Sequence, residues 1–456
     1  MSGRVAVIGG GVSGLTAAYR LGAAGIDATV LEADATTGGK LRSVEVGGLR
    51  LPAGPDSFLA RKPWAVELCR ELGIGGELIA PRASGALLWS AAGLVPYPTG
   101  TAFGIPGDLG DVFRWPGVSR RGRRRALLDL VKPKRRADAD ESLGSLLRRR
   151  LGDEVTDLAV GPLLGGLYAG DVDRLSVRAT FPELQKWEAA QGSLLRGAQA
   201  ASRNGRRSVG GPMFLKPRSG VERLTEVLAE RVGDGVQTGA RATAIEPAAD
   251  GWRVLTGDGV IESDAVVITV DAPAAATLLP RDAVVASLLA QIPFVSTGAV
   301  LFVYPEGSAA DLPDGSGFVV PRGAAPMTAS TWLSTKWPDP TYGDRAVLRC
   351  FVGAAGEEEI VDAPDEDLIA ACARHLSALL PLPERPEHAA VVRWPAAMPQ
   401  YVVGHLERVA EIRAGLPAGI FVTGQSLDGV GIADCVRAAG TAAEQVATYL
   451  AQEARA

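Results

Sequence analysis

The feature that most constrains the fold is a glycine-rich turn that directly follows a short apolar segment near the start of the chain. Residues 5–8 are continuously apolar, which predicts a strand buried on both faces of a parallel sheet. The turn after it matches G-x-G-x-x-G and consists of Gly9, Gly10, Gly11, Val12, Ser13 and Gly14. Residues 15–24 then predict a helix, and residues 28–31 predict a second strand. This order of elements indicates a dinucleotide-binding βαβ unit.

Each residue type in this unit has a physical reason. Gly9 permits the tight turn out of the strand, Gly11 lets the backbone approach a pyrophosphate, and Gly14 lets helix and strand pack closely. The helix start offers free N–H groups and a positive dipole end to the phosphates. Glu32, at the end of the second strand, is placed to accept a hydrogen bond from a ribose hydroxyl, and its charge disfavours NADP.

The βαβ unit alone does not distinguish FAD from NAD. A second glycine motif follows at residues 37–42, where Gly38 and Gly39 precede Lys40 and Arg42. Glycines here allow more close backbone contact, and the two cations would lie near the diphosphate. The motif resembles the second glycine motif of flavoproteins related to amine oxidases and phytoene desaturases, so FAD is the predicted cofactor.

Later segments are expected to return to the same domain. Residues 221–232 have helical periodicity, and residues 236–255 predict a small antiparallel meander before a buried strand at 265–269. Near the end of the chain, residues 419–424 predict a strand and residues 431–450 predict a helix. A helix that begins at Gly431 would direct N–H groups at the pyrimidine edge of the flavin, where reduction places negative charge.

Composition excludes several classes of function. A net charge of -5 argues against a general nucleic-acid binder. The 4 cysteines and 3 histidines are scattered, so neither a disulfide framework nor a metal site is predicted, and a reducing cytoplasm fits best. No apolar run reaches the roughly 18 residues of a membrane-spanning helix, so any membrane contact would be peripheral.

Four further blocks are more specific than the nucleotide motifs. They are residues 54–63 (GPDSFLARKP), 163–171 (LLGGLYAGD), 192–194 (GSL) and 393–405 (RWPAAMPQYVVGH). These blocks are similar to those of bacterial protoporphyrinogen and coproporphyrinogen III oxidases, and the resemblance extends over nearly the whole chain. One departure from the wider superfamily is that Gln425 follows Gly424, where many flavoenzymes place an acid that holds the ribitol.

The resemblance implies roles for residues in three groups. The ADP half of FAD would be held by Gly9 to Gly14, Glu32, Gly39 and Lys40, with Ala242 near the adenine. The flavin would lie along Gly54, Pro55, Asp56 and Ser57, and against Trp394, Val430, Gly431 and Ile432. The substrate candidates are Arg61 and Lys62 for propionates and Asp56 for pyrrole N–H groups. His405 is expected to be a structural hydrogen-bonding residue.

The reaction that the resemblance implies is the six-electron oxidation of a porphyrinogen to a porphyrin, with oxygen reduced to hydrogen peroxide. Flavin N5 would accept the hydride, and no protein side chain is assigned as the catalytic acid or base. Coproporphyrinogen III is the favoured substrate and protoporphyrinogen IX the alternative. A flavin amine oxidase or carotenoid desaturase on the same fold, and a non-catalytic flavin-binding scaffold, are the rival hypotheses; an aromatic content of only 5% disfavours the cage of an amine oxidase.

The expected architecture is α/β, of the amine-oxidase type: a doubly wound Rossmann-like FAD domain, a substrate domain with an antiparallel sheet, and a helical insertion. The FAD domain would comprise residues 1–80, 216–280 and 395–456. The helical insertion would span 90–210, and the substrate domain 281–394 with part of 81–90. Three interpretations remain open for the basic region 120–136: peripheral contact with the inner face of the cell membrane, docking of a partner such as ferrochelatase, or a solvated surface.

Overall fold

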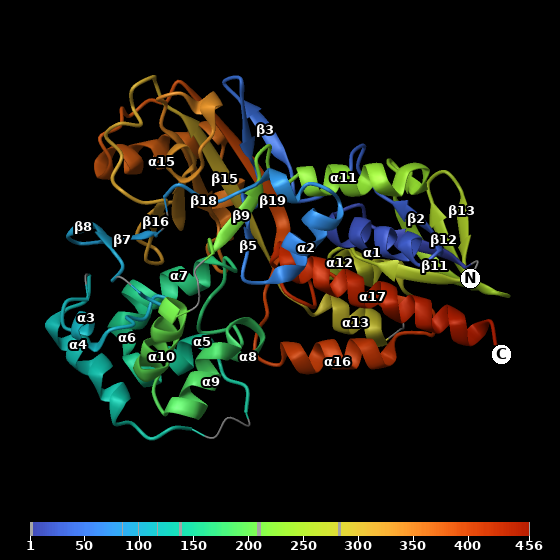
Figure 1. The fold of residues 1–456 in the computed structure, drawn as a ribbon, viewed down its shortest axis with the longest axis horizontal. Helices are drawn as coiled ribbons and strands as arrows, with labels where there is room; N and C mark the ends of the chain where they lie inside the picture. The colour runs from blue at the N-terminus through green and yellow to red at the C-terminus, as the bar shows by residue number, and fades with distance from the viewer. Residues whose placement is uncertain are drawn as a thin grey trace.

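The computed structural model describes residues 3–83, 85–98, 100–115, 117–135, 139–207, 211–280 and 284–455. Three regions are visible in Figure 1: a nucleotide-binding region that contains both termini, a sheet covered by α15, and a cluster of short helices. Within the described parts of the chain, no helix combines the length and apolarity needed to cross a bilayer.

A parallel sheet of 5 strands forms the centre of the nucleotide-binding region, in the order β10-β2-β1-β14-β20. Its strands come from distant parts of the chain: β1 (Arg4–Ile8), β2 (Asp27–Leu31), β10 (Val236–Gln237), β14 (Ala265–Ile268) and β20 (Ile420–Val422). Strand β1 is apolar throughout because Val5 and Val7 enter one core while Ala6 and Ile8 enter another. The sheet is therefore covered on both faces.

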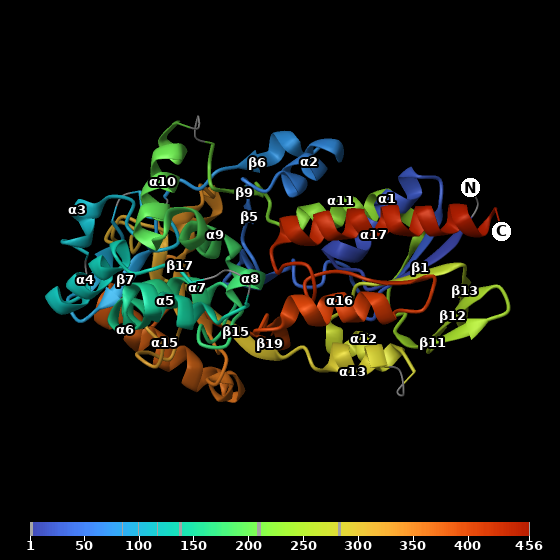
Figure 2. The ribbon, with the colours of Figure 1, turned by 90° about the horizontal axis from the view of Figure 1, so that it is seen from below.

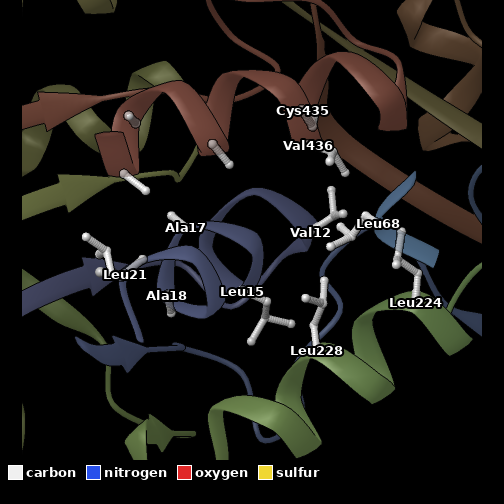
Figure 3. Close-up of a cluster of buried hydrophobic side chains, with 14 of the residues drawn as sticks. Val12, Leu15, Ala17, Ala18, Leu21, Leu68, Leu224, Leu228, Cys435 and Val436 are labelled. Carbon is white, nitrogen blue, oxygen red and sulfur yellow. The ribbon is translucent and has the colours of Figure 1, made fainter. Parts of the chain in front are cut away.

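Helices on the first face share the core drawn in Figure 3. They are α1 (Val12–Ala23), α2 (Pro63–Glu71), α11 (Arg223–Val232) and α17 (Ile432–Glu453). The opposite face, lower in Figure 2, carries three helices and a meander. These are α12 (Ala272–Leu278), α13 (Val284–Ala290), α16 (His405–Gly415), β11 (Ala242–Ala248), β12 (Gly251–Thr256) and β13 (Val260–Ser263).

The second region is built on a sheet of 7 strands in the order β19-β15-β18-β17-β16-β7-β8, antiparallel except between β16 and β7. Its strands are β7 (Leu87–Ser90), β8 (Gly93–Pro96), β15 (Phe294–Val303), β16 (Gly317–Val319), β17 (Ala329–Trp332), β18 (Val347–Val352) and β19 (His388–Pro399). Helix α15 (Asp365–Leu379) covers one face. Because side chains alternate along a strand, Leu348 and Cys350 enter the core under α15, whereas Arg349 and Phe351 lie on the opposite, inner face.

One end of the inner face is closed by other segments of the chain. The hairpin of β3 (Ser43–Val46) and β4 (Leu49–Pro52) packs there with α14 (Leu333–Lys336). A small sheet in the order β5-β9-β6 lies next to it and consists of β5 (Phe58–Leu59), β6 (Leu78–Ile79) and β9 (Phe214–Pro217). In Figures 1 and 2, β5 and β9 lie at the junction of the three regions.

The third region is helical and has its own core. Its helices are α3 (Leu109–Val112), α4 (Arg120–Leu127), α5 (Leu143–Leu151), α6 (Asp153–Val155), α7 (Gly161–Gly166), α8 (Val177–Thr180), α9 (Pro182–Gln191) and α10 (Leu194–Arg207). A buried ion pair between Arg150 and Asp129 ties α5 to the segment after α4. The expected doubly wound domain, second sheet and helical insertion are thus all present.

The borders between these regions differ in detail from those expected. The expected border at 394/395 falls inside β19, which continues to Pro399. Strand β8 belongs to the second sheet although it begins at Gly93. Helix α13 lies beyond residue 280, yet it packs in the core of the nucleotide-binding region. Only the tertiary packing assigns these elements to a region.

Candidate functional site

The turn after β1 has the geometry of a phosphate-binding loop. Gly9 has φ +108°, and a Cβ on Gly14 would lie 1.8 Å from the Gly9 carbonyl oxygen, so both positions require glycine. A Cβ on Gly11, by contrast, would meet no protein atom within 4 Å. The space in front of Gly11 is therefore open to a ligand that approaches the backbone.

The second glycine motif packs directly against the first. The Gly38 N–H donates to the Gly10 carbonyl oxygen at 2.9 Å, and Gly11 and Gly38 form an isolated parallel bridge. Gly39 has φ +57°, and a Cβ there would lie 3.4 Å from Gly11 Cα. The two motifs form one continuous backbone surface.

Two helices begin beside this surface. Helix α1 has Gly11 as its N-cap and α17 has Gly431, and no described side chain caps either start. Figure 3 shows Val12 next to Cys435 and Val436, so the first turns of the two helices lie side by side. Their free N–H groups and dipoles point to an anionic or electron-rich ligand between them.

The loop before α17 is fixed from both sides. Val430 packs against the core of the helical region, whereas Ile432 enters the core under α1. Gly424, at the end of β20, faces α1 closely enough that a Cβ there would lie 3.4 Å from Ser13 Oγ. The structure therefore brings the expected cofactor residues from both ends of the chain to one place.

Lys40 and Gln425 meet at a carboxylate that the sequence analysis did not identify. Lys40 Nζ lies 2.6 Å from Asp271 Oδ2, and Gln425 Nε2 donates to Asp271 Oδ1 at 2.7 Å and to the Ala397 carbonyl oxygen at 3.0 Å. Asp271 follows β14, at the carboxyl end of a parallel strand, where ligands of α/β sheets bind. The position of Asp271 shortly after a buried parallel strand is a sequence signal that could have identified it as a site residue.

Glu32 and Ala242 lie where the adenosine half of a dinucleotide is expected. The Glu32 carboxylate accepts hydrogen bonds from the backbone N–H groups of Gly10 at 2.7 Å and Asp34 at 2.8 Å. Ala242 is half-buried at the start of β11. Contacts of these residues with ribose and adenine remain predictions.

Trp394 is held against the segment that contains Gly54 and Pro55. Its Nε1 donates to the Ala53 carbonyl oxygen at 3.0 Å, and the Arg42 guanidinium lies 4.5 Å from the centre of its ring. A Cβ on Gly54 would lie 2.0 Å from the Lys40 carbonyl oxygen, so this segment and the second glycine motif are in close contact. Pro55 is exposed.

Asp56 is the centre of a buried charged cluster. Its carboxylate lies 2.8 Å from Lys336 Nζ and 3.5 Å from the Arg349 guanidinium, and it accepts from Ser57 Oγ at 2.8 Å and Trp337 Nε1 at 3.3 Å. Burial alone would raise the pKa of Asp56, but the two cations outweigh it and hold the pKa well below its usual range. Because these donors occupy most of the hydrogen-bond accepting capacity of the Asp56 carboxylate, little capacity remains for pyrrole N–H groups.

The substrate candidates Arg61 and Lys62 lie at the corner between β5 and α2. Arg61 is exposed. Lys62 is 43% exposed, and its Nζ lies 2.5 Å from a carboxylate oxygen of Asp434 in the first turn of α17. A substrate carboxylate at Lys62 would therefore compete with Asp434.

Comparisons with known proteins identify the family. The family model of flavin containing amine oxidoreductases matches residues 12–447. The coproporphyrinogen III oxidase of Bacillus subtilis is 33% identical over 98% of this chain and 98% of its own length. This protein belongs to the coproporphyrinogen III oxidases among the flavin-containing amine oxidoreductases. The enzyme of that name from Mycobacterium tuberculosis is 35% identical over 98% of both chains.

Solved structures agree with this assignment. A structure from Exiguobacterium sp. 255-15, named for protoporphyrinogen oxidase, has a TM-score of 0.87 and 32% identity, and the match covers 97% of this flavoenzyme and 98% of that chain. Putrescine oxidase, at 18% identity and a TM-score of 0.72, shares the fold alone; that match covers 98% of this chain and 99% of the other.

FAD is the cofactor of this flavoenzyme, and the residues present fit it. The open space at Gly11 admits a pyrophosphate, and the uncapped starts of α1 and α17, which lie side by side, supply N–H donors for an anionic or electron-rich part of the ligand. Two cations directly follow the second glycine motif: Lys40, which pairs with Asp271, and Arg42, which lies over the Trp394 ring.

Sequence reasoning missed the cationic half of the site and misjudged one histidine. Lys336 comes from α14 and Arg349 from β18 of the second sheet, and no local motif links them to Asp56. His405 is a buried structural residue, as expected, but the expected hydrogen bonds are absent: neither ring nitrogen has a hydrogen-bond partner among the described residues, and the ring stacks on Tyr401 with centroids 3.9 Å apart.

Proposed function

We propose that this flavoenzyme oxidises coproporphyrinogen III to coproporphyrin III and reduces oxygen to hydrogen peroxide. The observation that supports this most strongly is its end-to-end similarity to relatives named coproporphyrinogen III oxidase. The cations next to Asp56, Lys336 of α14 and Arg349 of the inner sheet face, suit a substrate that carries several carboxylates. Protoporphyrinogen IX is the alternative substrate, since the chloroplast protoporphyrinogen oxidase of Nicotiana tabacum is 27% identical over 98% of this chain.

Bound FAD would supply the hydride acceptor for each dehydrogenation. The glycine turn from Gly9 to Gly14 would hold the diphosphate, and the segment from Gly54 to Ser57 with Trp394 would line the flavin. The start of α17 at Gly431 would place its dipole at the pyrimidine edge and so favour negative charge there. The protein's own work is to orient the macrocycle and exclude water, because aromatisation drives the reaction.

Anaerobic mixing of the purified yellow protein with each porphyrinogen tests the proposal. We expect the flavin absorbance to bleach with both substrates and faster with coproporphyrinogen III. Faster bleaching with protoporphyrinogen IX would assign that substrate instead. If dithionite reduces the flavin but neither porphyrinogen bleaches it, the protein would be a non-catalytic flavin-binding scaffold. If only a polyamine bleaches the flavin, the protein would be an amine oxidase.

We also propose that the protein is cytoplasmic and that the exposed side of α4 touches anionic lipid at the inner face of the membrane. Three apolar side chains are exposed around this helix: Phe113 at 62%, Leu128 at 47% and Val131 at 79%. Arg120, Arg121 and Arg124 are exposed on the same helix. Apolar side chains among arginines are typical of interfacial helices.

Other cations of the basic region, and those of the following helix α5, have structural partners. Arg125 and Lys132 donate to carbonyl groups at the end of α5. Arg148 and Arg149 pair with carboxylates at distances of 2.7 Å and 2.6 Å. Arg136, also part of this region, lies outside the described residues. The proposed contact therefore rests on α4 and its apolar neighbours.

Co-sedimentation with vesicles tests the surface. We expect binding to vesicles rich in phosphatidylglycerol at low salt, little binding to phosphatidylcholine, and loss of binding in the double variant Leu128→Glu/Val131→Glu. Val284→Glu, at the start of α13, is the matched control because Val284 is 74% exposed in another region. No binding at low salt would contradict the proposal, and capture of purified ferrochelatase through the same residues would assign the surface to that partner instead.

A further inference from the structure

Lys216 on β9 is a buried lysine without a counter-charge. The residue is 6% exposed. The described residues give its ammonium group neither a hydrogen-bond acceptor nor a carboxylate in ion-pair range, whereas the neighbouring Lys336 has Asp56 at 2.8 Å. A buried charged group without a partner is rare because its desolvation costs free energy.

Lys216 and Lys336 share one aromatic ring. Their Nζ atoms lie 5.0 Å and 5.3 Å from the centre of the Trp337 indole. This cation–π contact helps to hold both ammonium groups in place. Lys336 also donates to both oxygens of Asp56, whereas the donors of Lys216 have no acceptor among the described residues. Two positioned ammonium groups on one ring form a ready site for a carboxylate.

The charge balance of the cluster leaves positive charge in excess. The single carboxylate of Asp56 is shared by Lys336 and Arg349, so its one negative charge faces three cations when Lys216 is included. Burial lowers the pKa of Lys216, and the nearby charge of Lys336 lowers it further. The more distant carboxylates of Asp56, Asp339 and Glu222 raise this pKa, but burial outweighs them. An anion bound next to Lys216 would complete the balance.

The cluster lies next to the segment that is expected to line the flavin. Strand β9 pairs with β5, in the register Leu59↔Phe214, directly after the segment from Gly54 to Ser57. Arg349 projects from the inner face of the second sheet, on which Phe351 and Thr331 are half-buried. Figures 1 and 2 place β9 at the junction of the three regions. An anionic substrate on the inner face would therefore meet the ammonium groups at its end.

We propose that Lys216, together with Lys336, binds a carboxylate of the substrate. This assignment rests on the proposed function, in which the substrate carboxylate is a propionate of coproporphyrinogen III. Asp56 is a positioning residue that fixes Lys336 through two oxygen contacts of 3.1 Å and 2.8 Å. Because coproporphyrinogen carries propionates where protoporphyrinogen carries vinyl groups, these lysines contribute to the choice between them.

Lys216→Met tests the assignment, with Lys216→Gln as a second neutral variant and Lys216→Arg as the conservative one. Loss of a charge-assisted hydrogen bond should raise KM for coproporphyrinogen III by about tenfold or more and change kcat by less than about threefold. Lys216→Arg should retain most of the affinity. Lys186→Met, which changes an exposed lysine of α9, is the matched control.

Two readouts separate binding from a merely structural role. Removal of an unpaired buried charge should leave Tm of the free enzyme unchanged or higher, whereas a structural ion pair would lower it. Lys216→Met should also weaken binding of the product coproporphyrin III but not of its tetramethyl ester.

Several results would overturn the assignment. One is an unchanged KM for coproporphyrinogen III in a folded, yellow Lys216→Met variant. Another is equal weakening of the binding of coproporphyrin III and of its tetramethyl ester. The third is the same change of KM in Lys186→Met. If the wild type oxidises no porphyrinogen, the proposed function fails by itself, and the comparison of acid with ester still decides the role of Lys216.

Discussion

Replacing His405 with phenylalanine should make the folded protein less sensitive to mild acid. The imidazole is fully buried and stacks on Tyr401 at an interplanar angle of 13°. Burial lowers the pKa of His405 from 6.5 to about 4, against a weaker opposing effect of the Leu427 backbone. Between about pH 4 and pH 6.5, the unfolded chain therefore binds a proton at His405 more readily than the folded protein does.

The sign and size of the effect follow from this difference. Because the folded-state pKa lies below the unfolded one, the free energy of unfolding is highest above pH 6.5 and falls as the pH approaches 4. A shift of this size corresponds to about 3 kcal/mol in total, of which about 2 kcal/mol is lost by about pH 5. Phenylalanine keeps the stack and cannot be protonated, so the variant should not show this loss.

Thermal unfolding of the FAD-loaded protein at about pH 7.5 and pH 5 measures the effect. Other groups also titrate in this range. The change of Tm between the two pH values is therefore measured for wild type and for His405→Phe, and the two changes are compared. A difference of a few degrees is expected at this size. His388→Gln, which removes an exposed histidine, is the control. Parallel Tm values of wild type and His405→Phe across pH would refute the reasoning.

Three further substitutions follow from the described contacts. Gly14→Ala should abolish FAD retention because its Cβ would lie 1.8 Å from a carbonyl oxygen of the preceding turn, whereas Gly22→Ala in the same helix meets nothing within 4 Å and should leave the flavin spectrum and Tm intact. Asp129→Ala should lower the free energy of unfolding by about 2–3 kcal/mol in denaturant titrations, because it removes the nearest carboxylate of the buried Arg150 guanidinium, which then keeps only Glu188 at 3.4 Å as an ionic partner; a change below about 1 kcal/mol would contradict this. Lys62→Glu should raise KM for coproporphyrinogen III more than it lowers kcat, and an unchanged KM would remove Lys62 from the substrate site.

The nucleotide half of the site could be predicted because its signals are local. Gly9, Gly11 and Gly14 lie within one turn, and Glu32 follows a strand whose length and composition are recognisable. The start of α17 at Gly431 was predictable for the same reason, as a strand followed by a glycine-rich loop and a helix. Physical constraints within a few residues of each other leave a pattern in the sequence.

The charged half could not be predicted because its members are joined only by tertiary structure. Asp56 and Lys336 are 280 positions apart, and Lys62 and Asp434 are 372 positions apart. Nothing in the neighbouring residues of Lys216 or Arg349 distinguishes a buried cation from an exposed one. Their meeting depends on how β9 and the inner sheet face are brought against the segment from Gly54 to Ser57.

The pairing of α1 with α17 has a consequence for how the enzyme is made. During synthesis the glycine turn and α1 leave the ribosome long before β20 and α17, so the early βαβ unit must wait with an incomplete sheet and one missing wall of its cofactor site. Flavin capture is therefore a late event of maturation. A nascent chain that stalls before residue 432 would be colourless and would expose the apolar side of α1 to chaperones and proteases.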